Sequence, residues 1–409
     1  MGVTIMTQVA QPNLASPQFK ADPHPFYTYL RHEAPVYRAV LPDRRVVWLL
    51  ARYDDTIMML KDERFVKDRT NAQPPGEPPR TQWVPGFARP LARNMLDLDA
   101  PDHARLRMLV SKVFTPRLVE QLRGRVQDLC DGLLTAAQRK GSLDLIHDYA
   151  LPIPATIIAE MLGVPVEDRT RFHRWSAQIT AIASGTDQLG ALPSLWLFIR
   201  YLRALFQQRR AQPRADLISE LIQVQEAGDR LSEDELLALV FILLVAGHET
   251  TVNLIGTGTL ALLDHPAQAA RLRRDPAIIP PAVEELVRYA SPVDLATERY
   301  AREDITIHDC IIRRGEMVLG VIGSANRDEQ HFVNGQELDL TREPNKHLGF
   351  GQGAHYCLGA PLARLEGQIA IHMLLQRFPD LRLAVPRESL LWRRGIFLRG
   401  LTRLPLLVG

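Results

Sequence analysis

The chain has 409 residues, of which 46% are hydrophobic and 23% are charged, and its formal net charge is only +2. This balance is ordinary for a soluble globular protein and gives no general attraction to nucleic acid or to a membrane surface. A chain of this length buries roughly three quarters of its unfolded surface, so it needs no disulfide staple. Cys130, Cys310 and Cys357 are few and far apart, which excludes a disulfide framework and a Cys-x-x-Cys zinc site and favours a cytoplasmic location.

The first part of the chain is expected to be mainly helical, after a disordered tail over about residues 1–15. This tail lacks the basic start and long apolar core of a signal peptide. Residues 23–35 have the pattern of a short amphipathic helix, and residues 45–62 that of a strand passing into a helix. Residues 67–96 contain six prolines and no clear period, so we expect a long loop, which is usually functional or mobile. Helical patterns return over residues 103–162.

A long apolar helix is predicted in the second half of the chain, after a region of broken helices at residues 165–212. Ser232 and Glu235 have the spacing of a capping box and open about thirty helical residues, which would span roughly 45 Å. Because this helix is apolar all round, it must run through the middle of a large core. Further helices, short strands and a glycine-rich loop follow. No internal repeat or linker interrupts the chain, so we expect one domain over residues 1–409, mainly α with small β-sheets.

Cys357 lies between the glycine-rich loop and the pattern of the last helix. The glycines let the backbone approach a flat ligand, and the free N–H groups of the helix start stabilise a thiolate. An inert buried cysteine is one alternative. A cysteine hydrolase is another, but His355 at two positions away has poor geometry for a catalytic base. A lone thiolate lacks the partners for tetrahedral zinc or an iron–sulfur cluster, whereas one thiolate is sufficient for haem iron.

The segment from Phe350 to Gly359, FGQGAHYCLG, resembles the haem-binding signature of the cytochrome P450 superfamily, and the chain resembles its soluble bacterial members (class I type). The resemblance covers nearly the whole chain and implies the cytochrome P450 fold, a large helical region with a long central helix and small β-sheets. It implies that Cys357 is the axial ligand of the iron of haem b, beside Phe350 and Gly359. Glu329, where the family often has Pro, and Leu338, where it usually has Phe, depart from the pattern.

Ala246, Gly247, Glu249 and Thr250 lie midway along the long helix, where polar groups are costly unless they are satisfied. One explanation is a local hydrogen bond from Thr250 to the carbonyl of Ala246. The group also resembles the oxygen-activating groove of the family. That resemblance implies that Ala246 and Gly247 leave room for the haem and oxygen, that Thr250 holds oxygen, and that Glu249 relays protons.

Two further sets of residues support the resemblance. Glu285 and Arg288 share one helix face and resemble the family's buried Glu-x-x-Arg pair, although an isolated surface pair is the alternative. His103 and Arg107 also share a helix face, which is otherwise read as a solvated basic surface. The resemblance implies a set of partners for the haem propionates, namely His103, Arg107, Arg299 and His355.

The implied activity is that of a haem-thiolate monooxygenase, which inserts one atom of O2 into a hydrophobic small molecule by hydroxylation or epoxidation. Polyketides, terpenoids, steroids and fatty acids are candidate substrates. The chain has no room for a flavin or iron–sulfur domain, so the electrons of NAD(P)H would arrive through a ferredoxin or flavodoxin and its reductase. A peroxygenase driven by H2O2 and a non-catalytic haem sensor or carrier are the alternatives, and Glu249 and Thr250 argue against both. A monomer is expected.

The predicted substrate pocket draws on the two irregular regions, the long helix and five further residues implied by the resemblance: Val293, Asp294, Leu295, Ile396 and Phe397. Asp294 is the polar exception. It would anchor a hydroxyl or amine of the substrate, unless it is a surface or backbone-bonded residue.

A basic patch on the side of the cysteine would dock an acidic redox partner, unless its charges are scattered and only increase solubility. Its expected members are Arg105, Lys112, Arg117, Lys346 and Arg364.

Overall fold

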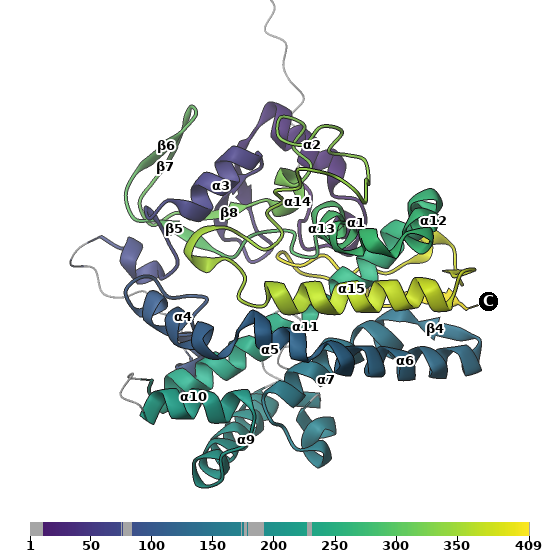
Figure 1. Ribbon diagram of the computed structural model, residues 1–409. Helices are drawn as coiled ribbons and strands as arrows, with labels where there is room; N and C mark the ends of the chain where they lie inside the picture. The colour runs from purple at the N-terminus through teal and green to yellow at the C-terminus, as the bar shows by residue number, and fades with distance from the viewer. Residues whose placement is uncertain are drawn as a thin grey trace, which may run out of the picture.

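Helices make up most of the computed structural model, which describes residues 11–74, 76, 84–172, 174–175, 178, 192–226 and 231–408 (Figure 1). The predicted fold class, mainly α with small sheets, is confirmed. The α-helices are α1 (Pro17–Ala21), α2 (His24–Glu33), α3 (Tyr53–Lys61), α4 (Asp102–Val113), α5 (Pro116–Gln121), α6 (Arg123–Lys140), α7 (Pro152–Met161), α9 (Leu192–Ala211), α10 (Leu217–Glu226), α11 (Glu233–Asp264), α12 (Pro266–Arg274), α13 (Ile279–Ala290), α14 (Ile322–Ala325) and α15 (Ala360–Arg377).

Helix α11 is the long central helix that the sequence predicts. It has 32 residues, and Ser232 caps it in a capping box with Glu235, as expected. By length and composition it could cross a membrane, but most of its side chains are buried within the protein. It packs against α7, α13 and α15, so it forms the axis around which the helical part is built.

The strands form three small sheets, of five, three and two strands. The five-stranded sheet has the order β1-β2-β8-β5-β3, in which only β2 and β8 are parallel. In Figure 1 it lies with α2, α3 and α14 above α15, whereas α6, α7, α9 and α10 lie below. The strands are β1 (Val36–Val40), β2 (Val46–Leu50), β3 (Phe65–Val66), β4 (Ser142–Asp144), β5 (Arg299–Ala301), β6 (Ile305–Ile307), β7 (Cys310–Ile312), β8 (Met317–Gly320), β9 (Arg382–Leu383) and β10 (Pro405–Leu407).

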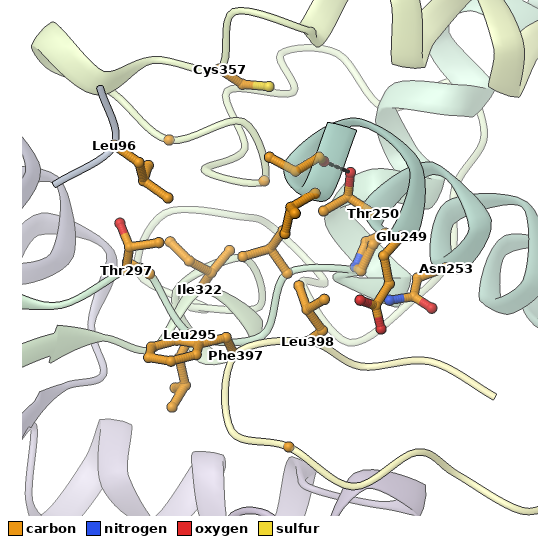
Figure 2. A pocket seen from close by; sticks show the side chains of 18 of the residues that line it. Leu96, Glu249, Thr250, Asn253, Leu295, Thr297, Ile322, Cys357, Phe397 and Leu398 are labelled. Carbon is orange, nitrogen blue, oxygen red and sulfur yellow. Dashed lines mark hydrogen bonds between the residues drawn. The ribbon is translucent and has the colours of Figure 1, made fainter. Parts of the chain in front are cut away.

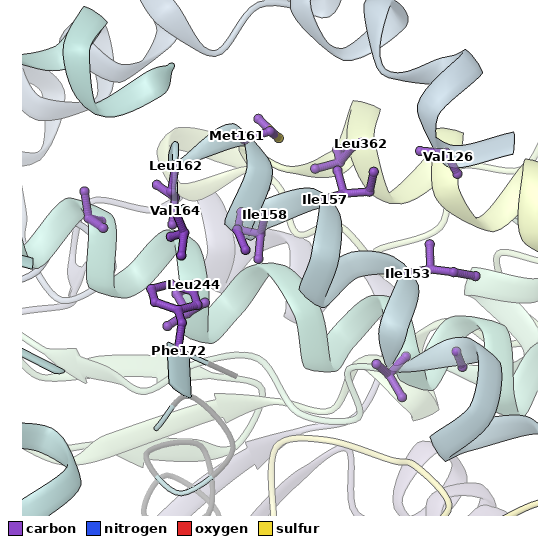
Figure 3. Close-up of a cluster of buried hydrophobic side chains, with 14 of the residues drawn as sticks. Val126, Ile153, Ile157, Ile158, Met161, Leu162, Val164, Phe172, Leu244 and Leu362 are labelled. Atoms are coloured by element: carbon purple, nitrogen blue, oxygen red, sulfur yellow. The ribbon is translucent and has the colours of Figure 1, made fainter. Parts of the chain in front are cut away.

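The largest part of the core includes the region where α11 packs against both α7 and α15 (Figure 3). Ile153, Ile157 and Ile158 repeat at helical spacing on α7 and are buried. Leu244 of α11 and Leu362 of α15 belong to the same cluster. This packing fixes α11 relative to α15, and therefore relative to the cysteine loop that immediately precedes α15.

Glu285 and Arg288 form a fully buried pair on α13. The Nε atom of Arg288 donates to Glu285 Oε2 at 2.7 Å. The guanidinium of Arg288 also donates to the backbone carbonyls of Asn326, Gly335 and Glu337. The pair thus ties α13 to the chain that leads into the cysteine loop, in the structural role expected for it.

Parts of the irregular regions are ordered. Of the tail expected to be disordered, residues 11–15 are described and Leu14 is buried, while residues 1–10 lie outside the described part. The long loop contains two 3-10 helices, η1 (Arg69–Ala72) and η2 (Gly86–Ala92). Positions 75 and 77–83 of this loop, and 173, 176–177 and 179–191 of the second region, are outside the described residues.

Candidate active site

A cavity of about 1170 Å3 lies between α11 and the loop that carries Cys357 (Figure 2). Pockets for one small ligand commonly measure about 300–1,000 Å3, so this cavity has room for a cofactor and a substrate together. Every predicted cofactor-binding and catalytic residue lines it, together with four of the five predicted substrate-binding residues: His103, Arg107, Ala246, Gly247, Glu249, Thr250, Val293, Leu295, Arg299, Phe350, His355, Cys357, Gly359, Ile396 and Phe397.

The glycine-rich loop places Cys357 on one wall of this cavity. The backbone N–H of Cys357 donates to the carbonyl of Phe350 at 2.9 Å, which closes the loop. Gly353 has φ +73, and a Cβ atom there would lie 2.7 Å from the carbonyl oxygen of Leu60, so this turn requires glycine. Burial raises the pKa of the Cys357 thiol, although the amides of Gly359 and Ala360 act against this rise. A metal cation would overcome that cost, because a coordinating thiol is deprotonated outright.

Four cationic or potentially cationic side chains meet at the end of the cavity near the loop. The imidazole rings of His103 and His355 have centroids 3.9 Å apart, and Arg107 and Arg299 lie at the same end. Burial, with nearby His103 and Arg299, lowers the pKa of His355 to about 2, and burial also lowers the pKa of Arg299. The buried Nε of Arg299 has no hydrogen-bond partner in the described part of the chain. Such an arrangement is suited to a ligand that brings anionic groups, as the two propionates of haem do.

The face of α11 toward Cys357 carries little bulk. Ala246 and Gly247 are not buried, and a Cβ atom at Gly247 would contact only Ile158, at 3.4 Å. The hydroxyl of Thr250 donates to the carbonyl of Ala246 at 3.0 Å, the local bond considered from the sequence, while Thr250 also lines the cavity. Glu249 is buried and pairs with Arg393 at 3.0 Å. A flat group fits between this face and Cys357.

The opposite wall is apolar and comes from two segments that pair with each other. Val293 and Leu398 form an isolated antiparallel bridge, and the amide of Leu295 donates to the carbonyl of Phe397 at 3.2 Å. These backbone contacts hold the side chains of Leu295 and Phe397 on the same wall (Figure 2). The wall therefore offers a hydrophobic surface to a substrate.

The prediction that Asp294 anchors a polar group of the substrate is wrong. Its carboxylate is 1% exposed, does not line the cavity, and accepts a hydrogen bond from Lys20 Nζ at 2.5 Å. Lys20 also donates to the carbonyl of Ile396 at 2.8 Å. Alternation along the segment explains the difference, because Val293 and Leu295 face the cavity while the residue between them faces the interior of the protein.

Three residues near the site were missed from the sequence. Asn253 lies four positions after Glu249, and this helical spacing was the available signal. Lys20 and Arg393 carry no comparable signal, because their partners lie 274 and 144 positions away in the chain.

The expected basic patch is partly neutralised. Arg364 pairs with Glu284 at 2.7 Å, and Arg105 pairs with Glu235 at the start of α11. Arg117 and Lys346 are exposed. The patch is therefore weaker than the sequence alone suggests.

The chain matches known proteins over nearly its full length. The family model for cytochrome P450 matches residues 198–382. The polyketide biosynthesis cytochrome P450 PksS of Bacillus subtilis is 42% identical over 95% of this chain and 96% of its own. Cytochrome P450 107B1 of Saccharopolyspora erythraea is 43% identical over 96% of both chains. The solved structure of myxobacterial cytochrome P450 CYP267B1 in complex with myristic acid is 42% identical, with a TM-score of 0.89 over 98% of this chain and 100% of that one.

The thiolate loop, the cationic end of the cavity and the full-length similarity lead to one identification. The chain belongs to the cytochrome P450 family of monooxygenases, which use haem b, O2 and electrons from NAD(P)H.

Proposed function

We propose that the enzyme inserts one oxygen atom of O2 into a hydrophobic secondary metabolite, with hydroxylation or epoxidation as the reaction. The observation that carries this proposal is the single cavity that has Cys357 on one wall and an apolar wall opposite. Its volume accommodates a substrate of medium to large size beside the cofactor. Bound haem supplies the redox chemistry with O2, while the protein supplies binding, orientation and proton transfer.

The residues of the chain divide these tasks. Cys357 would ligate the iron of bound haem, and its thiolate would donate electron density to the metal. Arg107 and Arg299, with His103 and His355, bind the two propionates through charge-assisted hydrogen bonds.

Across the cavity from Cys357, the small residues Ala246 and Gly247 would leave space for oxygen and substrate beside a bound haem. Thr250 provides a hydroxyl, and Glu249 provides the carboxylate that moves protons. The apolar side chains of Leu295 and Phe397 exclude water and orient the substrate.

Polyketides and fatty acids are the substrate classes that we favour, with terpenoids and steroids also compatible with an apolar wall. One relative is named for polyketide biosynthesis, and a solved relative binds myristic acid. Polyketides and fatty acids are largely apolar, which matches the apolar lining around Leu295 and Phe397. Binding would be detected as a spectral change of the haem on titration with myristic acid or with a macrolactone.

We propose that electrons arrive from a ferredoxin or flavodoxin and its reductase, and that the enzyme works as a cytoplasmic monomer. Lys112, Arg117 and Lys346 of the expected basic patch are exposed, and we propose that they take part in docking. Because surface charges are screened within about 8–10 Å at physiological salt, raising the ionic strength is expected to slow reduction. A reduction rate independent of salt would exclude electrostatic docking.

The first test is the absorption spectrum of the dithionite-reduced protein under carbon monoxide. A strongly red-shifted Soret band that is lost in Cys357→Ala is expected. A Soret band at the position of histidine-ligated haem would contradict the thiolate assignment. Turnover that requires NAD(P)H and redox proteins would then separate a monooxygenase from a peroxygenase driven by H2O2 and from a haem carrier.

A further inference from the structure

One corner of the cavity is lined by polar groups. The roles proposed for Glu249 and Thr250 do not explain all of these groups. We call it the polar corner and define it by Glu249, Asn253, Arg393 and Gly400, all of which line the cavity. Figure 2 shows Glu249 and Asn253 beside each other on α11, both farther from Cys357 than Thr250 is.

Arg393 reaches the corner from the C-terminal segment. Its guanidinium lies 3.0 Å from a carboxylate oxygen of Glu249, and the side chains of the two residues are 32% and 8% exposed. Its backbone N–H donates to the carbonyl of Gly400 at 2.9 Å, and Trp392 and Leu401 form a bridge next to this bond. A short hairpin therefore presents Arg393 and Gly400 together to α11. The guanidinium is always protonated, so it can hold the carboxylate but cannot pass on a proton.

Asn253 carries the polar groups of this corner that lack hydrogen-bond partners among the described residues. It is 1% exposed, and among the residues that the structure describes neither its amide nitrogen nor its amide oxygen has a hydrogen-bond partner. A Cβ atom at Gly400 would lie 1.9 Å from its amide oxygen, so the absence of a side chain at Gly400 makes room for this amide. Buried polar groups without partners are rare, and each calls for a ligand or an ordered water.

Water is the ligand that best satisfies the amide nitrogen and oxygen of Asn253. A buried water molecule makes about three hydrogen bonds to polar groups that would otherwise lack partners. The corner offers a donor and an acceptor on Asn253, an acceptor on Glu249 and a donor on Arg393. One turn of helix separates Asn253 from Glu249, so both side chains lie on the same face of α11.

We propose that the polar corner binds water, and that Asn253 and Arg393 are positioning residues that hold this water against the Glu249 carboxylate. The inference rests on the proposed function, in which Glu249 moves protons. For each proton that Glu249 passes toward the hydroxyl of Thr250, its carboxylate takes up one from the bound water, which solvent replenishes. The transfer needs no oxidant or reductant. Arg393 keeps the carboxylate turned toward the water throughout.

The test uses haem-loaded protein with three substitutions. Asn253→Leu keeps the approximate size of the side chain and removes both hydrogen-bonding groups, and Arg393→Leu removes the ion pair. Arg387→Leu is a matched control, because Arg387 pairs at 3.1 Å with Asp264 and so joins the same two regions away from the cavity. Arg393→Lys tests whether a charge at this position restores the function.

The first readout is a high-resolution crystal structure of each haem-loaded protein. We expect ordered water within hydrogen-bonding distance of Asn253 and Glu249 in the wild type and in Arg387→Leu, and its loss in Asn253→Leu. A dry corner in the wild type would overturn the proposal. A corner that is dry until dodecanoic acid or a hydroxylated analogue places a polar group there would also overturn it and would identify a substrate-recognition site instead.

The second readout is O2 consumption driven by NAD(P)H with a surrogate ferredoxin and reductase, measured without substrate in H2O and D2O. Proton delivery by a positioned group contributes large rate factors, so we expect Asn253→Leu and Arg393→Leu to be about tenfold slower, with a larger solvent isotope effect. When H2O2 drives the oxidation of a phenol, the peroxide brings its own protons. The rate of this reaction in each variant should therefore remain within about twofold of the wild-type rate. Rates equal to those of Arg387→Leu would contradict the positioning roles.

The carbon monoxide spectrum keeps the two proposals apart. If all variants retain the red-shifted band and also keep the ordered water and the proton-dependent rate of the wild type, the positioning roles fail while the proposed function stands. If the wild type lacks that band, the proposed function fails first. If Asn253→Leu does not fold, Asn253→Ala, which removes both hydrogen-bonding groups in a smaller side chain, replaces it.

Discussion

The two walls of the cavity are built in different ways. The wall that carries Cys357 comes mainly from one continuous stretch, residues 349–363, which joins the glycine-rich loop to the start of α15. The opposite wall is assembled from segments that meet only in the fold, including residues 292–297 and 393–400. Chemistry placed on a continuous stretch is readable from sequence, whereas a wall that is assembled from distant segments must be seen in the structure.

The wall that carries Cys357 depends on this one residue, and this is its largest difference from the opposite wall. Cys357→Ala is expected to abolish the red-shifted carbon monoxide band completely, because no other thiolate lines the cavity within the described residues. Cys310→Ala is the matched control, since Cys310 lies on β7, remote from the cavity. The absorption spectrum of each variant measures the effect. A retained band in Cys357→Ala would remove the functional distinction between the two walls.

The continuous wall depends on a buried pair behind it. Arg288→Leu is expected to lower the free energy of unfolding by about 3–5 kcal/mol. It removes the fully buried partner of Glu285, which keeps only the less buried Arg342 as an ion-pair partner among the described residues, and it removes three hydrogen bonds to backbone carbonyls. Arg125→Leu, which breaks a partly exposed pair with Glu160, should cost less than about 1 kcal/mol. Urea unfolding of the haem-loaded proteins measures both. Equal losses would mean that the Glu285–Arg288 pair does not hold this wall.

The assembled wall has its own buried pair. Lys20→Met is expected to destabilise the protein by about 3 kcal/mol, because it strands the carboxylate of Asp294 away from water. The double variant Lys20→Met/Asp294→Leu should recover part of this loss, since it removes the unpaired charge. The change should also shift the order of preference among apolar ligands, because Lys20 binds the carbonyl of Ile396. Unchanged preferences would show that the wall does not depend on this contact.

A smaller loss of folding stability is expected as the pH falls below about 4.5. Burial acts to raise the pKa of Glu284, but hydrogen bonds from Arg364 and His347 lower it to about 2, against an ordinary value of 4.5. A carboxylate with a lowered pKa stabilises the fold above about pH 4.5, and this contribution is lost as the pH falls from 4.5 toward 2. Between pH 4.5 and 3.5 the loss should approach about 1 kcal/mol. Glu284→Gln should flatten the stability curve over that range, and an unchanged slope would contradict the assignment.

Much of the fold was predictable because local signals and the core agree. The capping box at Ser232 and the apolar run after it predict α11, and its burial follows from having no polar face. The resemblance to the family indicated Cys357, Glu249 and Thr250 because each lies in a short continuous motif, and the structure places all three at one cavity. Asp294 was misread because a polar residue in an apolar stretch looks the same whether its partner is a ligand or a lysine 274 positions away.

The C-terminal hairpin described above has a consequence for how this enzyme changes over evolution. Within a few residues it contributes Phe397 to the apolar wall of the cavity and Arg393 to the contact with Glu249. An insertion or a shift of register in this segment would alter both at once. Variants selected for a new substrate through this hairpin should therefore divert more electrons to peroxide and water. Variants selected through residues 292–297 are free of that constraint, so they offer the easier route to new selectivity.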